Sequence, residues 1–146
     1  MSTAEFSVEV DAPPERVWAV VSDPHNIPHW ERHVVSVRVP DGSLGKGSRY
    51  AVVMSFMGVR VRVRGEILEW EPPWHAVIWL RGPLEATIDT TVAKLPRSRS
   101  VLRHEVSYTF RGPLGGVVAA GLNAVGGAQL GIRHGTIAQK RQIEEG

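Results

Sequence analysis

The segment Val59–Arg64 alternates valine with arginine without a break, and this alternation most constrains what the chain can fold into. Side chains alternate between the two faces of a β-strand, so the three valines share one face and the three arginines share the other. Three unpaired charges in an apolar core would be prohibitively costly, so the valines must face inward. The segment therefore predicts a sheet with one covered face and one solvent-exposed face.

Further stretches of period two, bounded by glycine and proline turns, predict a multistranded antiparallel sheet. Gly65 is expected to interrupt the central strand as a bulge. The other predicted strands are Thr3–Val10, Val34–Val39, Arg49–Met57, Ile67–Trp70, Ala76–Leu80, Leu84–Leu95 and Ser100–Phe110.

Two short helices are predicted after the first strand. The segment Asp11–Glu15 combines an acidic cap candidate, two prolines and an acidic first turn, and the helix it starts ends near Ser22. A second helical turn is expected over 25–30, where Pro28 limits its length.

The last third of the chain changes to helical spacing. One face of a long C-terminal helix is predicted to carry Leu114, Val118, Leu122, Val125, Gln129, Ile132 and Ile143. Eight glycines between Gly112 and Gly135 weaken this helix, and a break is expected at Gly126-Gly127. Two explanations of these glycines stay open: they allow close packing on the sheet, or they leave space for a bound molecule.

Composition excludes several classes of protein. The chain has 146 residues, 42% hydrophobic and 22% charged, which fits one globular domain, and it has no cysteine for disulfides or thiolate metal sites. The net charge is only +2 and the arginines do not cluster in one run, so nucleic-acid binding is not expected. The sequence contains no stretch of 18 apolar residues, so no membrane span is predicted. The polar N-terminus lacks the features of a secretory signal, so a cytoplasmic location is expected.

Several segments resemble the SRPBCC superfamily, the START-related group with the helix-grip fold. They are Val10–Pro24, His29-Trp30, Gly65–Ile67 and Glu69–Pro73. The resemblance implies a single α+β domain over residues 1–146, in which an antiparallel sheet of about six to seven strands wraps around a long C-terminal helix. It also implies a deep apolar cavity between sheet and helix. The superfamily includes polyketide cyclases and aromatases, lipid and quinone binders, plant hormone-binding proteins and oxygenase domains.

Strand alternation and helical spacing predict which residues line this cavity. His104 and Tyr108 fall on the apolar side of the last strand, where they are either core residues with satisfied polar atoms or groups that orient a ligand and move protons. Trp18 and Trp30 are expected to be core anchors. The predicted ligand-binding residues are Tyr50, Val52, Met54, Phe56, Val61, Val63, Ile88, Thr90, Val106, Leu122, Val125 and Gln129.

The outer face is expected to carry a charge ladder. Glu85 and Asp89 fall on the same face as Arg60, Arg62 and Arg64, and they pair with them if the strands are adjacent.

No cofactor or metal is expected. His25, His29 and His33 are four residues apart, but Pro24 and Pro28 break the helix that would align them, and no inward carboxylate completes a ligand set. Nucleotide-binding glycine motifs and a serine-hydrolase elbow are also missing from the sequence.

Two functions compete for the predicted cavity. In the first, a polyketide cyclase or aromatase holds a poly-ketone chain so that one carbon faces one carbonyl, with an acyl carrier protein as the partner. In the second, the cavity carries or senses an apolar small molecule without chemistry. Cavity polarity separates them, because a cyclase needs at least two convergent polar groups near the reacting carbons. A third reading, a surface-acting stress-response module, requires an exposed apolar patch.

Overall fold

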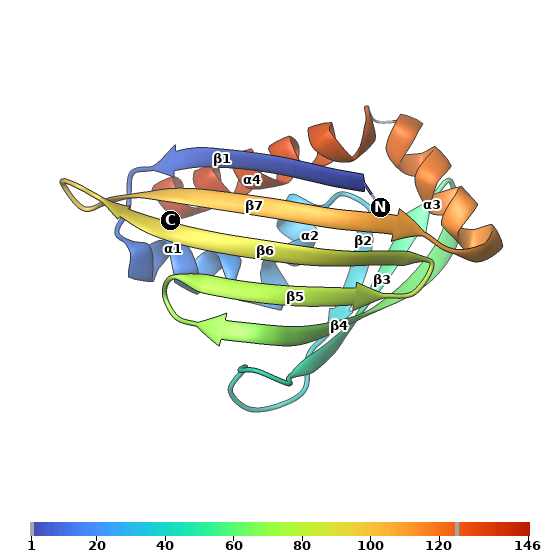
Figure 1. Cartoon of the computed structure of the whole chain (residues 1–146), viewed down its shortest axis with the longest axis horizontal. Helices are drawn as coiled ribbons and strands as arrows, with labels where there is room; N and C mark the ends of the chain where they lie inside the picture. Colours follow the sequence, from blue (N-terminus) through green and yellow to red (C-terminus); the bar gives the residue numbers. More distant parts are fainter. Residues whose placement is uncertain (1, 125) are drawn as a thin grey trace.

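The computed structural model describes residues 2–124 and 126–146, and it confirms the predicted α+β helix-grip fold. Within these residues, seven antiparallel strands form one curved sheet in the order β1-β7-β6-β5-β4-β3-β2, and helix α4 lies behind it along β1 (Figure 1). The strands are β1 (Ser2–Val10), β2 (Val34–Arg38), β3 (Arg49–Phe56), β4 (Val59–Glu71), β5 (His75–Arg81), β6 (Leu84–Leu95) and β7 (Arg99–Phe110).

The helices cover the concave side and one end of the sheet. The two short predicted helices are α1 (Pro14–Val21) and the pair η1 (Pro24–Asn26) and α2 (Ile27–Trp30), while α3 (Gly112–Ala124) and α4 (Gly127–Glu145) form the C-terminal third. The predicted helix break is confirmed, because Gly126 and Gly127 have φ angles of 99° and 89°. This left-handed backbone favours glycine and ends a right-handed helix.

The described helices are short or polar relative to a membrane-spanning helix. Taken singly, none of them is both long and apolar enough to cross a membrane. Only α3 and α4 counted together as a bent pair reach that length and composition. The pair meets these criteria by length and composition alone, and a buried core helix can meet the same criteria.

Gly65 does not form the predicted bulge. It stays in register between Tyr50 on β3 and Leu80 on β5, and the register shift in β4 falls between Ile67 and Glu69 instead. A Cβ atom at position 65 would lie only 2.5 Å from the Tyr50 ring. Glycine is therefore needed here because the tyrosine ring lies across the backbone of the neighbouring strand.

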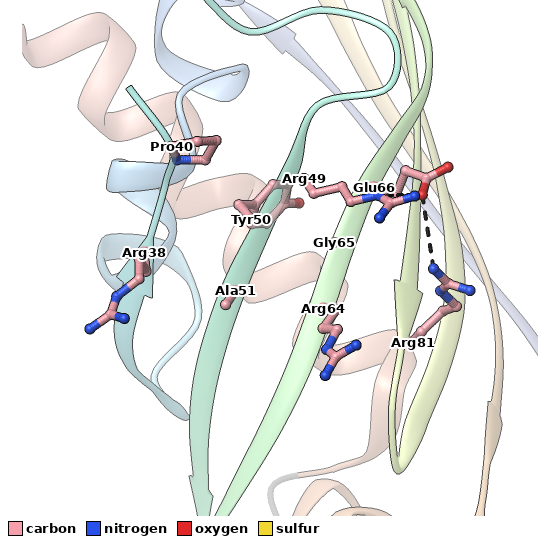
Figure 2. Close-up of a pocket in the computed structure, with 9 residues that line it drawn as sticks. All are labelled: Arg38, Pro40, Arg49, Tyr50, Ala51, Arg64, Gly65, Glu66 and Arg81. Atoms are coloured by element: carbon pink, nitrogen blue, oxygen red, sulfur yellow. Dashed lines mark hydrogen bonds and ion pairs between the residues drawn. The ribbon is translucent and has the colours of Figure 1, made fainter. Parts of the chain in front are cut away.

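The predicted charge ladder on the outer face is wrong. Strand β5 lies between β4 and β6, so the carboxylates of β6 cannot face the arginines of β4. Glu85 pairs with Arg111 at 2.6 Å and Asp89 pairs with His75 at 2.9 Å. Arg64 of β4 instead lies on the outer face among Arg38, Arg49 and Arg81 of neighbouring strands (Figure 2).

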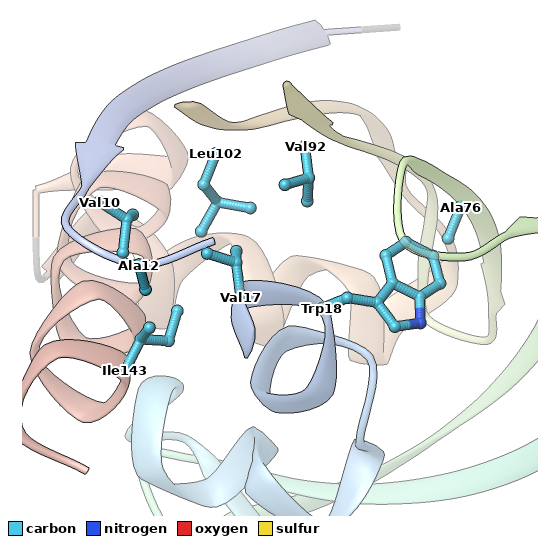
Figure 3. Packing of buried hydrophobic residues seen from close by; sticks show 8 residues of the cluster. All are labelled: Val10, Ala12, Val17, Trp18, Ala76, Val92, Leu102 and Ile143. Atoms are coloured by element: carbon cyan, nitrogen blue, oxygen red, sulfur yellow. The ribbon is translucent and has the colours of Figure 1, made fainter. Parts of the chain in front are cut away.

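A cluster of buried side chains closes the end of the molecule where α1 meets α4. Figure 3 shows Val17 and Trp18 of α1 among side chains from the strands and α4. Trp18 is 8% exposed and meets Trp70 edge-on, with ring centroids 5.0 Å apart, so its predicted role as a core anchor is confirmed. The remaining members are Val10, Ala12, Ala76, Val92, Leu102 and Ile143.

Candidate functional site

A cavity of about 280 Å³ lies between the inner face of the sheet and the helices α2, α3 and α4. Its walls are mostly apolar, because the inward rows of β3, β6 and β7 are rich in aliphatic and aromatic side chains. The predicted residues that line it are Tyr50, Val52, Met54, Phe56, Val63, Ile88, Thr90, His104, Val106, Tyr108 and Leu122.

Two predicted residues lie elsewhere, and Val125 lies outside the described residues. Val61 is 1% exposed and belongs to the buried cluster of Phe56 and Val118, at the end of the sheet where α3 packs. Gln129 hydrogen-bonds to both backbone groups of Glu5 and fastens α4 to the edge strand β1. The break before α4 resets the helical phase, which turns Gln129 away from the cavity.

Three side chains form a hydrogen-bonded chain in the cavity wall. The Nδ1 atom of His104 lies 2.7 Å from the Thr90 hydroxyl, and its Nε2 atom lies 2.7 Å from Oε1 of Gln139. An amide oxygen only accepts, so Nε2 carries the proton and donates it to Gln139. In the neutral ring Nδ1 then accepts from the Thr90 hydroxyl. Strands β6 and β7 place Thr90 directly opposite His104, while Gln139 comes from α4.

The surroundings of His104 favour its neutral form. Burial lowers the pKa of the imidazole below its usual 6.5, and the hydrogen bond to Gln139 opposes that effect. Thr90 and Gln139 are themselves only 8% and 6% exposed. The three side chains therefore form a desolvated polar cluster within a mostly apolar wall.

The lowered pKa of His104 predicts a pH-dependent stability. Below pH 6.5 the unfolded chain binds a proton at this ring that the folded chain rejects, so the free energy of unfolding falls as the pH drops below 6.5. The slope from this group approaches about 1.4 kcal/mol per pH unit. Denaturant unfolding between pH 7 and pH 5 measures it, with His104→Leu as the variant that lacks the group. Equal slopes in the two proteins contradict this prediction.

Two tyrosines line the same cavity, Tyr50 of β3 and Tyr108 of β7. Tyr50 is 6% exposed, and burial raises the pKa of its phenol well above the usual range, so the group stays protonated. Tyr108 lines the cavity beside Phe110, with ring centroids 5.7 Å apart. Neither hydroxyl takes part in a side-chain hydrogen bond among the described residues. Both are therefore available to donate to a ligand.

Both explanations of the glycines, close packing and space for a bound molecule, are correct, but at different positions. A Cβ atom at Gly121 of α3 would lie 2.6 Å from the Phe56 ring, so this glycine allows close packing. A Cβ atom at Gly131 of α4 would meet nothing within 4 Å, and this residue lines the cavity. Small residues on one face of α4, Ala128, Gly131 and Gly135, therefore leave the cavity open.

Several lining residues were not predicted from the sequence. Trp30 was expected in the core, but it lines the cavity and its indole N–H donates to Gln142 of α4 at 2.8 Å. Glu31 lines the cavity as well, and its Oε1 atom lies 2.6 Å from Nδ1 of His33. Positions 128, 131, 135 and 139 are spaced as on one face of a helix. This spacing could have placed Gln139 in the cavity wall if the start of α4 after the break had been known.

The three spaced histidines do not form a metal site. His25 lies 2.9 Å from the Asp23 carboxylate, and His33 stacks on Phe56 beside Glu31. Helix α2 begins only at Ile27, so the three rings do not share a helical face. Within residues 2–124 and 126–146, no group of three or more potential ligand side chains gathers.

Comparisons with known proteins agree with this architecture. The family model described as "Polyketide cyclase / dehydrase and lipid transport" matches residues 1–132. A search among curated proteins returns no match.

The solved structures with a similar fold share little sequence. TTHA0849 from Thermus thermophilus superposes with a TM-score of 0.75 at 17% identity, covering 97% of each chain. The Zhui aromatase/cyclase from Streptomyces sp. R1128 has a TM-score of 0.71 at 14% identity, covering 99% of this chain and 94% of that one. The di-domain ARO/CYC BexL has a TM-score of 0.69 at 21% identity, covering 99% of this chain and 47% of that one. At these identities the likeness concerns the fold alone.

Proposed function

Because the chain belongs to the polyketide cyclase/dehydrase and lipid transport family, we propose that its cavity binds an apolar poly-ketone and orients it for cyclisation or dehydration. One observation carries this proposal: the buried cluster of Thr90, His104 and Gln139 lines a mostly apolar cavity that Tyr50 and Tyr108 also line. Convergent polar groups in an apolar cavity fix the orientation of a ligand that carries several oxygen atoms.

The proposed reaction requires few chemical groups from the protein. In an intramolecular aldol condensation, an enol carbon of the chain attacks one of its own carbonyl carbons, one C–C bond forms, and water leaves in the dehydration that follows. Holding the two carbons close and excluding water supplies most of the acceleration. Tyr50 and Tyr108, as protonated phenols, donate hydrogen bonds to the carbonyl oxygens on which negative charge develops.

His104 would act in this reaction through its partners. Its Nδ1 atom is already occupied by the Thr90 hydroxyl, so it accepts a proton from a ligand either through that hydroxyl or after exchanging it for the ligand. A neutral ring with a lowered pKa is a weak base. We assign proton transfer to the Thr90–His104 pair despite this weak basicity, and carbonyl binding to the tyrosines.

The occupied imidazole also favours a second candidate, a carrier without chemistry. Both ring nitrogens of His104 are satisfied by side chains, as in a core histidine that shapes the wall. In that case the cavity binds an apolar molecule such as a lipid or a quinone, and the polar cluster only recognises one oxygen atom of it.

Cavity volume and the chemical form of the substrate both bear on the proposed function. A volume of about 280 Å³ lies just below the usual range for ligand pockets, roughly 300 to 1,000 Å³. A growing poly-ketone reaches such a cavity as a thioester, so an acyl carrier protein is the proposed partner if the protein is a cyclase. A carrier needs no such partner.

A synthetic linear poly-β-ketone thioester separates the two candidates. For a cyclase, the protein should speed formation of an aromatic product and change the product ratio relative to buffer, as followed by chromatography. Thr90→Val and Tyr108→Phe should each lower that rate at least tenfold. If the thioester binds but the product ratio equals that in buffer, the carrier function is supported instead.

A further inference from the structure

Four arginines from four consecutive strands surround a second pocket, of about 380 Å³, on the outer side of the sheet (Figure 2). The register places Arg38 of β2, Ala51 of β3, Arg64 of β4 and Arg81 of β5 in one row across the sheet. The methyl group of Ala51 is short, which leaves a hollow between the longer arginine side chains. Arg49 lies beside this row on β3.

This row concentrates positive charge that the protein itself neutralises only in part. Glu66 is the one carboxylate among the residues lining the pocket, and it pairs with Arg49 at 3.1 Å and Arg81 at 3.9 Å. Neither Arg38 nor Arg64 forms an ion pair with any carboxylate in the described part of the chain. The lining therefore carries four guanidinium groups against one carboxylate.

The placement of Arg64 opposes folding stability. It lies directly opposite Arg81 on the neighbouring strand, and like charges in that position repel each other. Glu66 offsets this repulsion only in part, since Arg49 holds the same carboxylate oxygen more closely than Arg81 does. The carboxylates of β6 are engaged by Arg111 and His75. A bound anion would remove this repulsion.

From this row and its pocket, we propose that the outer face of strands β2–β5 binds a phosphate-bearing ligand, held chiefly between Arg38 and Arg64 above Ala51. Adjacent strands are about 4.8 Å apart, so the Cα atoms of these two arginines are about 10 Å apart. Arginine side chains of that separation can both reach one phosphate group. Each guanidinium donates two parallel hydrogen bonds to phosphate oxygens, a geometry that lysine does not offer.

The site does not depend on the proposed function, because the arginines that would hold the phosphate lie on the outer face and do not line the inner cavity. The phosphate belongs either to a free phosphorylated metabolite or to a lipid headgroup, and the chemistry at the arginines is the same. Inorganic pyrophosphate serves as the probe for the first source. Vesicles of phosphatidylcholine with phosphatidic acid serve for the second, with vesicles of phosphatidylcholine alone as their control.

Calorimetric titration at low salt, where charge screening is weak, tests the site with a matched pair of variants. Arg64→Gln removes a lining guanidinium, whereas Arg60→Gln removes one from the same strand and face outside the pocket. We expect Arg64→Gln and Arg38→Gln each to weaken pyrophosphate or phosphatidic-acid binding at least tenfold, and Arg60→Gln to change it less than twofold. Without ligand, Arg64→Gln should melt at the same temperature as the wild type or higher.

These binding measurements can either support or overturn the proposed phosphate site. Binding of pyrophosphate, of the phosphatidic-acid vesicles or of both, lost in Arg38→Gln and Arg64→Gln but kept in Arg60→Gln, supports the site and identifies the source. Equal weakening by Arg60→Gln and Arg64→Gln means that only diffuse positive charge attracts the probe, which overturns the proposal. So does the lack of any binding by the wild type at millimolar pyrophosphate and to both kinds of vesicle.

Discussion

Gly131→Phe should abolish binding of an apolar ligand while leaving the fold intact. The residue lines the cavity on α4, and nothing lies within 4 Å of a Cβ atom at this position, so a benzyl group would enter a space of about 280 Å³. Phenylalanine also has a higher helix propensity than glycine, by a few tenths of a kcal/mol. We expect at least a hundredfold loss of affinity for 1-anilinonaphthalene-8-sulfonate, measured by fluorescence titration, or about 2.7 kcal/mol.

Gly116→Phe is the matched control for this variant. Position 116 is also helical and also meets nothing within 4 Å, but it lies exposed on α3 and does not line the cavity. The control should bind the probe like the wild type. If Gly131→Phe binds the probe as tightly as Gly116→Phe does, the cavity is not where apolar molecules bind.

His104→Leu should lower the free energy of unfolding by about 3 kcal/mol. The substitution removes the partner of the Thr90 hydroxyl and of the Gln139 amide oxygen, each within 2.7 Å of the ring. Both groups remain buried, and a buried polar group without a partner costs about 1 to 3 kcal/mol. Urea unfolding monitored by circular dichroism measures the loss.

The triple variant Thr90→Val, His104→Leu, Gln139→Leu separates hydrogen bonding from packing. It replaces all three polar side chains by apolar ones of similar size, so no buried group is left unsatisfied. We expect it to recover most of the stability lost in His104→Leu. A triple variant that is less stable than the single one would contradict the assignment of this cluster as a mutually satisfied network. Its affinity for a poly-ketone, at restored stability, then reports the contribution of the cluster to ligand binding alone.

Local sequence pattern determined the strands, their inward rows and the helix break. Alternation depends only on the pleat of a strand, so His104 and Tyr108 could be placed on the inner face before any partner strand was known. The glycine pair at 126–127 could be read as a break because interior glycines weaken a helix. Several short motifs along the chain, each of them local as well, together indicated the superfamily fold.

Tertiary structure alone decided which of these rows meet. Strand β5 lies between β4 and β6, so the expected charge ladder does not form. Instead, Arg64 of β4 lies opposite Arg81 of β5 in a row of arginines. The break before α4 resets its helical phase, which turned Gln129 toward β1 and brought Gln139 to His104. Strand order and helix rotation depend on contacts between residues far apart in the chain, and no local periodicity encodes such contacts.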